Sequence, residues 1–87
     1  MRIVAVYREY SDHAREVTEW IDQFERRSGH TVEQLNPDSP EGESFCSARE
    51  IMEYPTITVT DDDGRPYNIW SGSPLPVIDE VMSYIAR

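Results

Sequence analysis

The sequence contains no lysine, a single cysteine and no long apolar run within its 87 residues. One cysteine, Cys46, excludes an internal disulfide, a dithiol redox pair and a thiolate-rich metal site. No window approaches the ~18 apolar residues that a membrane span requires, and the first residues turn charged too early for a signal peptide. We therefore expect one domain spanning residues 1–87, located in the cytoplasm and making no contact with membranes.

The charge of the chain is strongly negative. Its eight basic residues, all arginine, stand against seventeen acidic ones, so the formal net charge is −9. Such a field repels nucleic acid and anionic membrane surfaces, and no basic stripe offsets it. Acidity without lysine is consistent with genome base composition or with adaptation to salt, and neither explanation bears on mechanism. The charge favours a neutral or basic partner.

Apolar and β-branched runs predict the strands. The first run is typical of a strand buried on both faces, and the second is weaker and more polar. Asp63 and Gly64 form a hairpin signal between the last two runs. Pro66 has no N–H to donate, which places the last strand at an edge of the sheet. The four predicted strands cover residues 2–7, 31–35, 56–60 and 66–71.

A first helix is predicted after the polar turn that follows the first strand. Ser11 or Asp12 is expected to cap its start, and Gly29 suits the position just past its end. The spacing of four apolar residues places them on one stripe of this helix. These residues are Val17, Trp20, Ile21 and Phe24.

Two further helices are expected. The second is placed near residues 43–53, because Gly42 disfavours an earlier start. Ser73 and Pro74 are predicted to cap and open the third. The inward-facing residues are expected to be Phe45, Ala48, Ile51 and Met52 in the second helix, and Leu75, Ile78, Met82 and Ile85 in the third.

The stretch "IMEYPTITVTDDDGRPYNIWSG", residues 51–72, combines a helix end, a proline–threonine pair, an apolar strand, a DG turn and a glycine after the return strand. With the order strand–helix–strand–helix–strand–strand–helix, it resembles the thioredoxin-like fold in its small, glutaredoxin-like form, an α/β fold. The resemblance implies a four-stranded mixed sheet in the order 2-1-3-4 with three helices. It also implies that the Tyr54–Pro55 peptide bond is cis and lies beside the active-site position.

The resemblance places a Cys-x-x-Cys motif at the start of the first helix. In this sequence the corresponding window is SDHA, formed by Ser11, Asp12, His13 and Ala14. Without a thiol in this window, the site cannot perform dithiol exchange, the single-cysteine glutaredoxin mechanism or cluster binding through that cysteine. We therefore expect no catalytic residue and no cofactor here.

The polar residues of this window can be interpreted in structural or in functional terms. Ser11 is either a helix cap or a hydroxyl that binds a glutathione thiolate, as serine does in some glutathione transferases, which carry an additional helical domain. The Asp12 carboxylate would weaken the binding of any anionic ligand at the helix start. His13 is expected to be a solvated surface residue, because a general base also needs a nucleophile and an orienting partner.

The remaining reactive groups give no metal signature. Cys46 is either a small core residue or the thiol of a sensor or peroxidase. Asp61, Asp62 and Asp63 lack the ligand spacing of a calcium loop and are expected to form a solvated hairpin tip. Two histidines and one cysteine do not make a metal site, and His30 receives no role.

The sequence thus predicts a redox-inactive binding or adaptor module rather than an enzyme. Its partner is expected to be a protein or an extended peptide, added as a strand beside the cis-proline. The alternatives are a glutathione-binding protein using Ser11 and a monothiol sensor or peroxidase using Cys46. The predicted contact face consists of Tyr10, Ser11, Asp12, His13, Tyr54 and Pro55.

Overall fold

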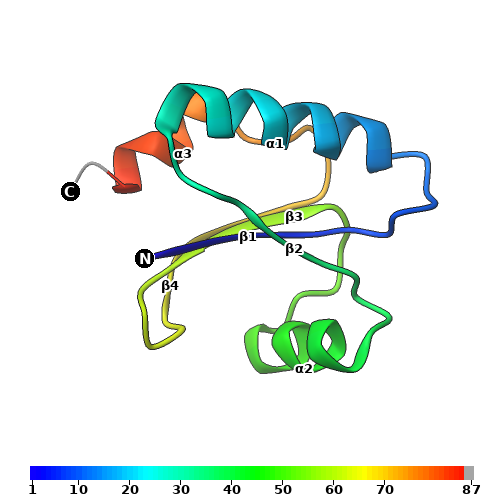
Figure 1. Cartoon of the computed structure of the whole chain (residues 1–87). Coiled ribbons are helices and arrows are strands. Elements are labelled where there is room, and N and C mark those ends of the chain that lie inside the picture. Colours follow the sequence, from blue (N-terminus) through cyan, green and yellow to red (C-terminus); the bar gives the residue numbers. More distant parts are fainter. Residues whose placement is uncertain (86–87) are drawn as a thin grey trace.

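The computed structural model describes residues 1–85 as a four-stranded sheet with helices on both faces (Figure 1). A search of this described part finds no helix long and apolar enough to cross a membrane. The elements are β1 (Arg2–Val6), α1 (Ala14–Ser28), β2 (Glu33–Leu35), α2 (Pro40–Arg49), β3 (Thr56–Thr60), β4 (Pro66–Ser71) and α3 (Ile78–Ile85).

The order of the strands in the sheet is β2-β1-β3-β4. β1 runs parallel to β2 and antiparallel to β3, and β3 runs antiparallel to β4. This is the mixed sheet that the sequence predicts, with β4 and its Pro66 at an edge. Val6 pairs with Thr56, and Thr56 pairs with Ser71. The end of β1, the start of β3 and the end of β4 therefore meet at one end of the sheet.

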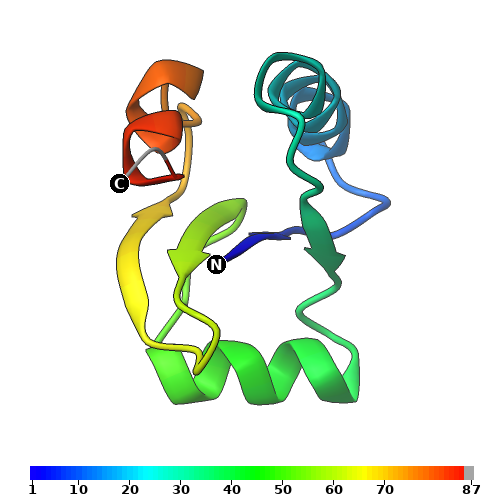
Figure 2. The ribbon, with the colours of Figure 1, turned by 60° about the vertical axis from the view of Figure 1, so that its left-hand side comes forward.

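The helices divide between the two faces of the sheet, with α1 and α3 on one and α2 on the other (Figure 2). β3 is buried along its whole length. The α2 side buries Val4, Val6, Phe45, Cys46 and Ile51. The larger cluster, on the side of α1 and α3, buries Ile3, Ala5, Tyr7, Val17, Trp20, Ile21, Phe24, Val32, Ile57, Val59, Ile78 and Val81.

The hairpin between β3 and β4 follows the sequence prediction. Oδ1 of Asp61 accepts hydrogen bonds from the main-chain N–H groups of Asp63 and Arg65, both at 2.9 Å. Gly64 has a φ of 90°, a conformation that side chains rarely adopt. These contacts account for the tight turn at a solvated tip.

The predicted cap of α1 is wrong. The helix begins at Ala14, and the N-cap position is His13, which makes no side-chain capping bond. Ser11 Oγ donates instead to the carbonyl of Arg8 at 2.5 Å, and Asp12 is exposed. Competition from a nearby main-chain carbonyl is a recognised alternative for serine. The end of the helix is confirmed at Gly29, which has a φ of 75°.

α2 begins three residues earlier than the sequence prediction and ends earlier too. Ser39 caps it, accepting a hydrogen bond from the Gly42 N–H at 3.0 Å. Gly42 does not interrupt the helix, because its missing side chain admits the carbonyl oxygen of Asn36, which would lie 1.8 Å from a Cβ. Phe45 and Ile51 are buried as predicted. The inward assignment of two other residues is wrong, since Ala48 and Met52 are exposed.

The predicted start of α3 is also wrong. The helix begins at Ile78, and the Ser73–Pro74 peptide bond, which is cis, lies in the preceding loop. Because α3 starts four residues after Pro74, Ser73 does not cap it and Pro74 does not open it. The predicted apolar stripe is confirmed: Ile78 is buried, and Leu75, Met82 and Ile85 pack against the core.

Candidate functional site

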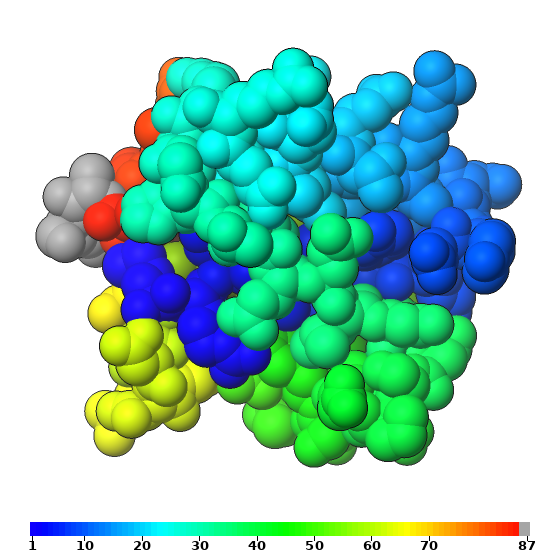
Figure 3. Space-filling view, in the orientation of Figure 1, coloured from blue at the N-terminus to red at the C-terminus, as the bar shows by residue number. Residues whose placement is uncertain are grey.

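Four loops converge at the end of the sheet where β1 and β4 finish and β3 begins. They connect β1 to α1, β2 to α2, α2 to β3, and β4 to α3. The Gly72 N–H donates to the Pro55 carbonyl at 2.7 Å, which joins the last two loops. The β1–α1 loop protrudes at this end of the molecule between α1 and α2 (Figure 3). Ser11, Asp12 and His13 of the window and Pro55 belong to this set of loops, and Ala14 begins α1.

Arg8 connects three of these loops. Its guanidinium binds Asp38 through Nε at 3.0 Å and Nη2 at 3.3 Å, and it lies 4.9 Å from the centre of the Tyr54 ring. The hydrogen bond from Arg8 lowers the pKa of the Asp38 carboxyl. Sequence analysis missed Arg8 and Asp38, because their partners are distant in the chain and no local pattern marks them.

Two polar side chains of the window 11–14, those of Ser11 and His13, are turned toward their own loop. The Ser11 hydroxyl donates its proton to the Arg8 carbonyl. Nε2 of His13 accepts the Arg8 N–H at 3.3 Å, and its ring lies edge-on to Tyr7 with centroids 6.5 Å apart. These bonds shape the loop around Arg8, so neither side chain is arranged as a nucleophile or a general base.

The outer surface of the same loop carries Tyr10 and Asp12. The Tyr10 side chain is 97% exposed, and Asp12 is exposed as well. Met52, in the loop after α2, is 85% exposed. The structure therefore brings Ser11 and His13 together around Arg8, whereas Tyr10 and Asp12 project into solvent.

Tyr54 and Pro55 lie on the other side of Arg8. The Tyr54–Pro55 peptide bond is cis, and Pro55 is fully buried. Within residues 1–85, neither the main-chain N–H nor the C=O of Tyr54 has a hydrogen-bond partner. An extended segment could therefore pair with this residue without displacing an existing bond.

Cys46 lies behind Tyr54 and is 5% exposed. Burial raises the pKa of its thiol, although a hydrogen bond with Tyr54 and the charge of Arg49 act in the opposite direction. A raised pKa and little exposure both disfavour a reactive thiolate. No group of three or more His, Cys, Asp or Glu side chains in the described part of the chain could hold a metal ion.

Comparison with known proteins identifies structural neighbours only. No family model matches the chain, and no curated protein matches its sequence. Thioredoxin 1 of the thermophilic eubacterium Thermosipho africanus TCF52B aligns with a TM-score of 0.69 and 15% identity, over 99% of this chain and 91% of its own.

Two further neighbours agree with this result. Fasciola hepatica thioredoxin has a TM-score of 0.70 and 13% identity, over 97% of this chain and 76% of its own. A malarial protein has a TM-score of 0.66 and 12% identity, over 97% and 91% of the two chains. At these identities the likeness concerns the backbone, and it agrees with the strand order and the element order described above. The chain therefore has the thioredoxin-like fold.

Proposed function

We propose that this protein is a redox-inactive thioredoxin-fold module that binds an extended segment of a protein partner. The observation that carries the proposal is the pairing-competent main chain of Tyr54, set beside a window that contains Ser11 and Ala14 in place of thiols. Dithiol exchange at this end of the sheet would need thiols, and residues 11–14 contain none. Binding without dithiol exchange is the activity that these two features support together.

Strand addition is the binding mode that suits this surface. A peptide that pairs with the N–H and C=O of Tyr54 would gain main-chain hydrogen bonds, and its side chains would contact the surrounding loops. Tyr10 and Met52 offer exposed apolar area on those loops. Aromatic and methionine side chains are enriched where proteins meet partners. The acidic character of the chain favours a neutral or basic segment.

No observation favours the two alternatives from the sequence. A serine that stabilises a glutathione thiolate must donate its hydroxyl proton to the sulfur, and the Ser11 proton is donated to Arg8. A thiol sensor or peroxidase needs an accessible thiol of low pKa, and Cys46 is buried with a raised pKa.

The proposal is tested by selecting peptides from a displayed random library against the folded protein. Synthetic copies of the selected peptides are then titrated into ¹⁵N-labelled protein. We expect the largest shifts at the amides of Tyr54 and Thr56. Truncation of a tyrosine that serves as a binding hot spot costs ~2 kcal/mol or more, so Tyr10→Ala should weaken binding by more than about tenfold.

Tyr67→Ala is the matched control, because Tyr67 is also exposed but lies on β4 toward the opposite end of the sheet. It should leave affinity unchanged. Selected peptides whose shifts avoid Tyr54, or an equal loss of affinity in the two variants, would contradict the proposal. Failure of the library to enrich any peptide would also count against it.

A further inference from the structure

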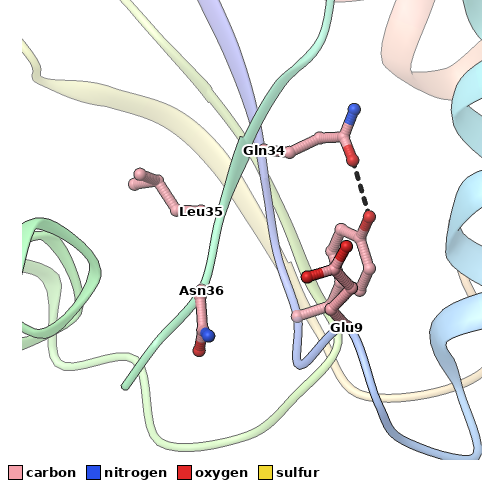
Figure 4. Close-up of a pocket in the computed structure, with 5 residues that line it drawn as sticks. Glu9, Gln34, Leu35 and Asn36 are labelled. Atoms are coloured by element: carbon pink, nitrogen blue, oxygen red, sulfur yellow. Dashed lines mark hydrogen bonds between the residues drawn. The ribbon is translucent and has the colours of Figure 1, made fainter. Parts of the chain in front are cut away.

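A pocket of about 210 Å³ opens beside the proposed contact face, between the β1–α1 loop and the edge strand β2. A pocket of about 210 Å³ has room for one side chain. The lining residues are Tyr7, Glu9, Gln34, Leu35 and Asn36. Glu9 and Gln34 lie on the same side of β2, whereas the Leu35 side chain points to the other side (Figure 4).

The lining is rich in hydrogen-bond acceptors. The Tyr7 hydroxyl donates to Gln34 Oε1 at 2.6 Å, so the lone pairs of its oxygen remain to accept. The Glu9 carboxylate makes no ion pair or hydrogen bond within the described residues 1–85. Both groups line the same pocket and can accept hydrogen bonds there without giving up a partner.

The pocket also has a negative field. Burial, and after it the Glu9 charge, raises the pKa of the Tyr7 hydroxyl, and both side chains line the pocket. Among the residues that the structure describes, no basic side chain lines the pocket. Arg8, the neighbour of Glu9 in sequence, is bound to Asp38 and faces Tyr54. A cation entering the pocket would thus meet an uncompensated carboxylate.

We propose that this pocket binds the guanidinium of an arginine side chain carried by the partner segment. A guanidinium is planar and presents several N–H donors, which matches a carboxylate with a phenol oxygen beside it. Glu9 lies between Arg8, which contacts Tyr54, and the exposed Tyr10. The pocket therefore deepens the proposed function by giving the bound segment a basic anchor, and it rests on that function for the identity of its ligand as a peptide.

The test uses Nα-acetyl-argininamide as the probe and its citrulline counterpart as the uncharged control of nearly equal shape. Both are titrated into ¹⁵N-labelled protein. We expect the arginine compound to shift the amides of Glu9, Gln34 and Asn36, and the citrulline compound to bind at least about fivefold more weakly. Glu9→Gln should weaken binding of the arginine compound by a similar factor, because a solvent-accessible ion pair is worth up to ~1 kcal/mol.

Glu43→Gln removes the same charge from an exposed position on α2 and serves as the control variant. It should leave the affinity for the arginine compound unchanged. Equal binding of the two compounds, or equal effects of Glu9→Gln and Glu43→Gln, would overturn the proposal.

The outcomes separate the pocket from the proposed function. If the selected peptides shift the Tyr54 amide while the arginine compound leaves the Glu9 amide unaffected, the pocket is refuted and strand addition stands. If the arginine compound shifts the Glu9 amide but no selected peptide binds at Tyr54, the pocket is supported and the proposed function is refuted.

Discussion

Replacing Gly42 by alanine tests how closely α2 approaches the loop that precedes it. The new Cβ would lie 1.8 Å from the carbonyl oxygen and 2.7 Å from the carbonyl carbon of Asn36. To increase the first distance to 3.0 Å, α2 and the main chain at Asn36 must move apart by about 1.2 Å. The obstructing atoms belong to the main chain, so no side-chain rotation relieves the contact.

The expected loss combines two opposing terms. Overpacking of this kind costs about 1–3 kcal/mol of stability. Because the main chain at Asn36 cannot rotate away, we take the upper end of this range, ~3 kcal/mol. Alanine regains up to ~1 kcal/mol through its higher helix propensity. The free energy of unfolding should therefore fall by about 2 kcal/mol, which lowers the Tm of a domain of this size by roughly 8–16 °C.

Thermal unfolding followed by circular dichroism measures the effect. Gly29→Ala is the matched control, because nothing lies within 4 Å of its added Cβ and only the φ of +75° opposes the change. Alanine in that conformation should lower the free energy of unfolding by about 1 kcal/mol, which is less than the loss expected for Gly42→Ala. A Gly42→Ala protein as stable as the original would refute the close approach of α2 to Asn36. The same result would undermine the placement of the loop that carries Asp38.

Three further perturbations follow from individual contacts. Trp20→Phe should lower the free energy of unfolding in urea by about 1–2 kcal/mol, because the Pro76 carbonyl loses its donor at 2.8 Å. The Arg2 hydrogen bond lowers the pKa of the Glu33 carboxyl, so this pair stabilises the fold above the ordinary glutamate pKa and loses its effect as pH falls through the lowered value. Glu33→Gln should therefore lower the free energy of unfolding at pH 7 by at most ~1 kcal/mol, as for an exposed ion pair, and should leave it unchanged in strong acid. Iodoacetamide should alkylate Cys46 about tenfold more slowly in the folded protein than in urea, because burial raises the pKa of its thiol.

The parts of the fold that sequence analysis predicted are those fixed by local chemistry. Asp63 and Gly64 determine the hairpin through a tight turn, and Pro66 restricts its strand to an edge. β3 was located to the residue because an apolar β-branched run is bounded by Pro55 and by the acidic turn. These signals act over a few residues and do not depend on distant contacts.

The errors occurred where one specific contact, rather than the propensity of a residue, decides the local structure. Gly42 disfavours a helix by propensity alone, yet its missing side chain allows the Asn36 carbonyl to approach α2. Ser11 could cap α1, but the Arg8 carbonyl takes its hydroxyl proton. The candidate site shows the same limit, because Arg8 meets Asp38 and Tyr54 only after the sheet has formed.

The unequal division of the core has a consequence for motion at the contact face. α2 buries only Gly42, Phe45 and Cys46 of its own residues, and the cluster on its side of the sheet is the smaller one. Segments with few buried contacts open locally at a lower free energy than the global unfolding. We expect the amides of α2 to exchange with deuterium through such openings, whereas those of β3 should exchange only through global unfolding. Because α2 joins the loops that carry Asp38 and Tyr54, we expect each such opening to free both sides of the proposed contact face at once.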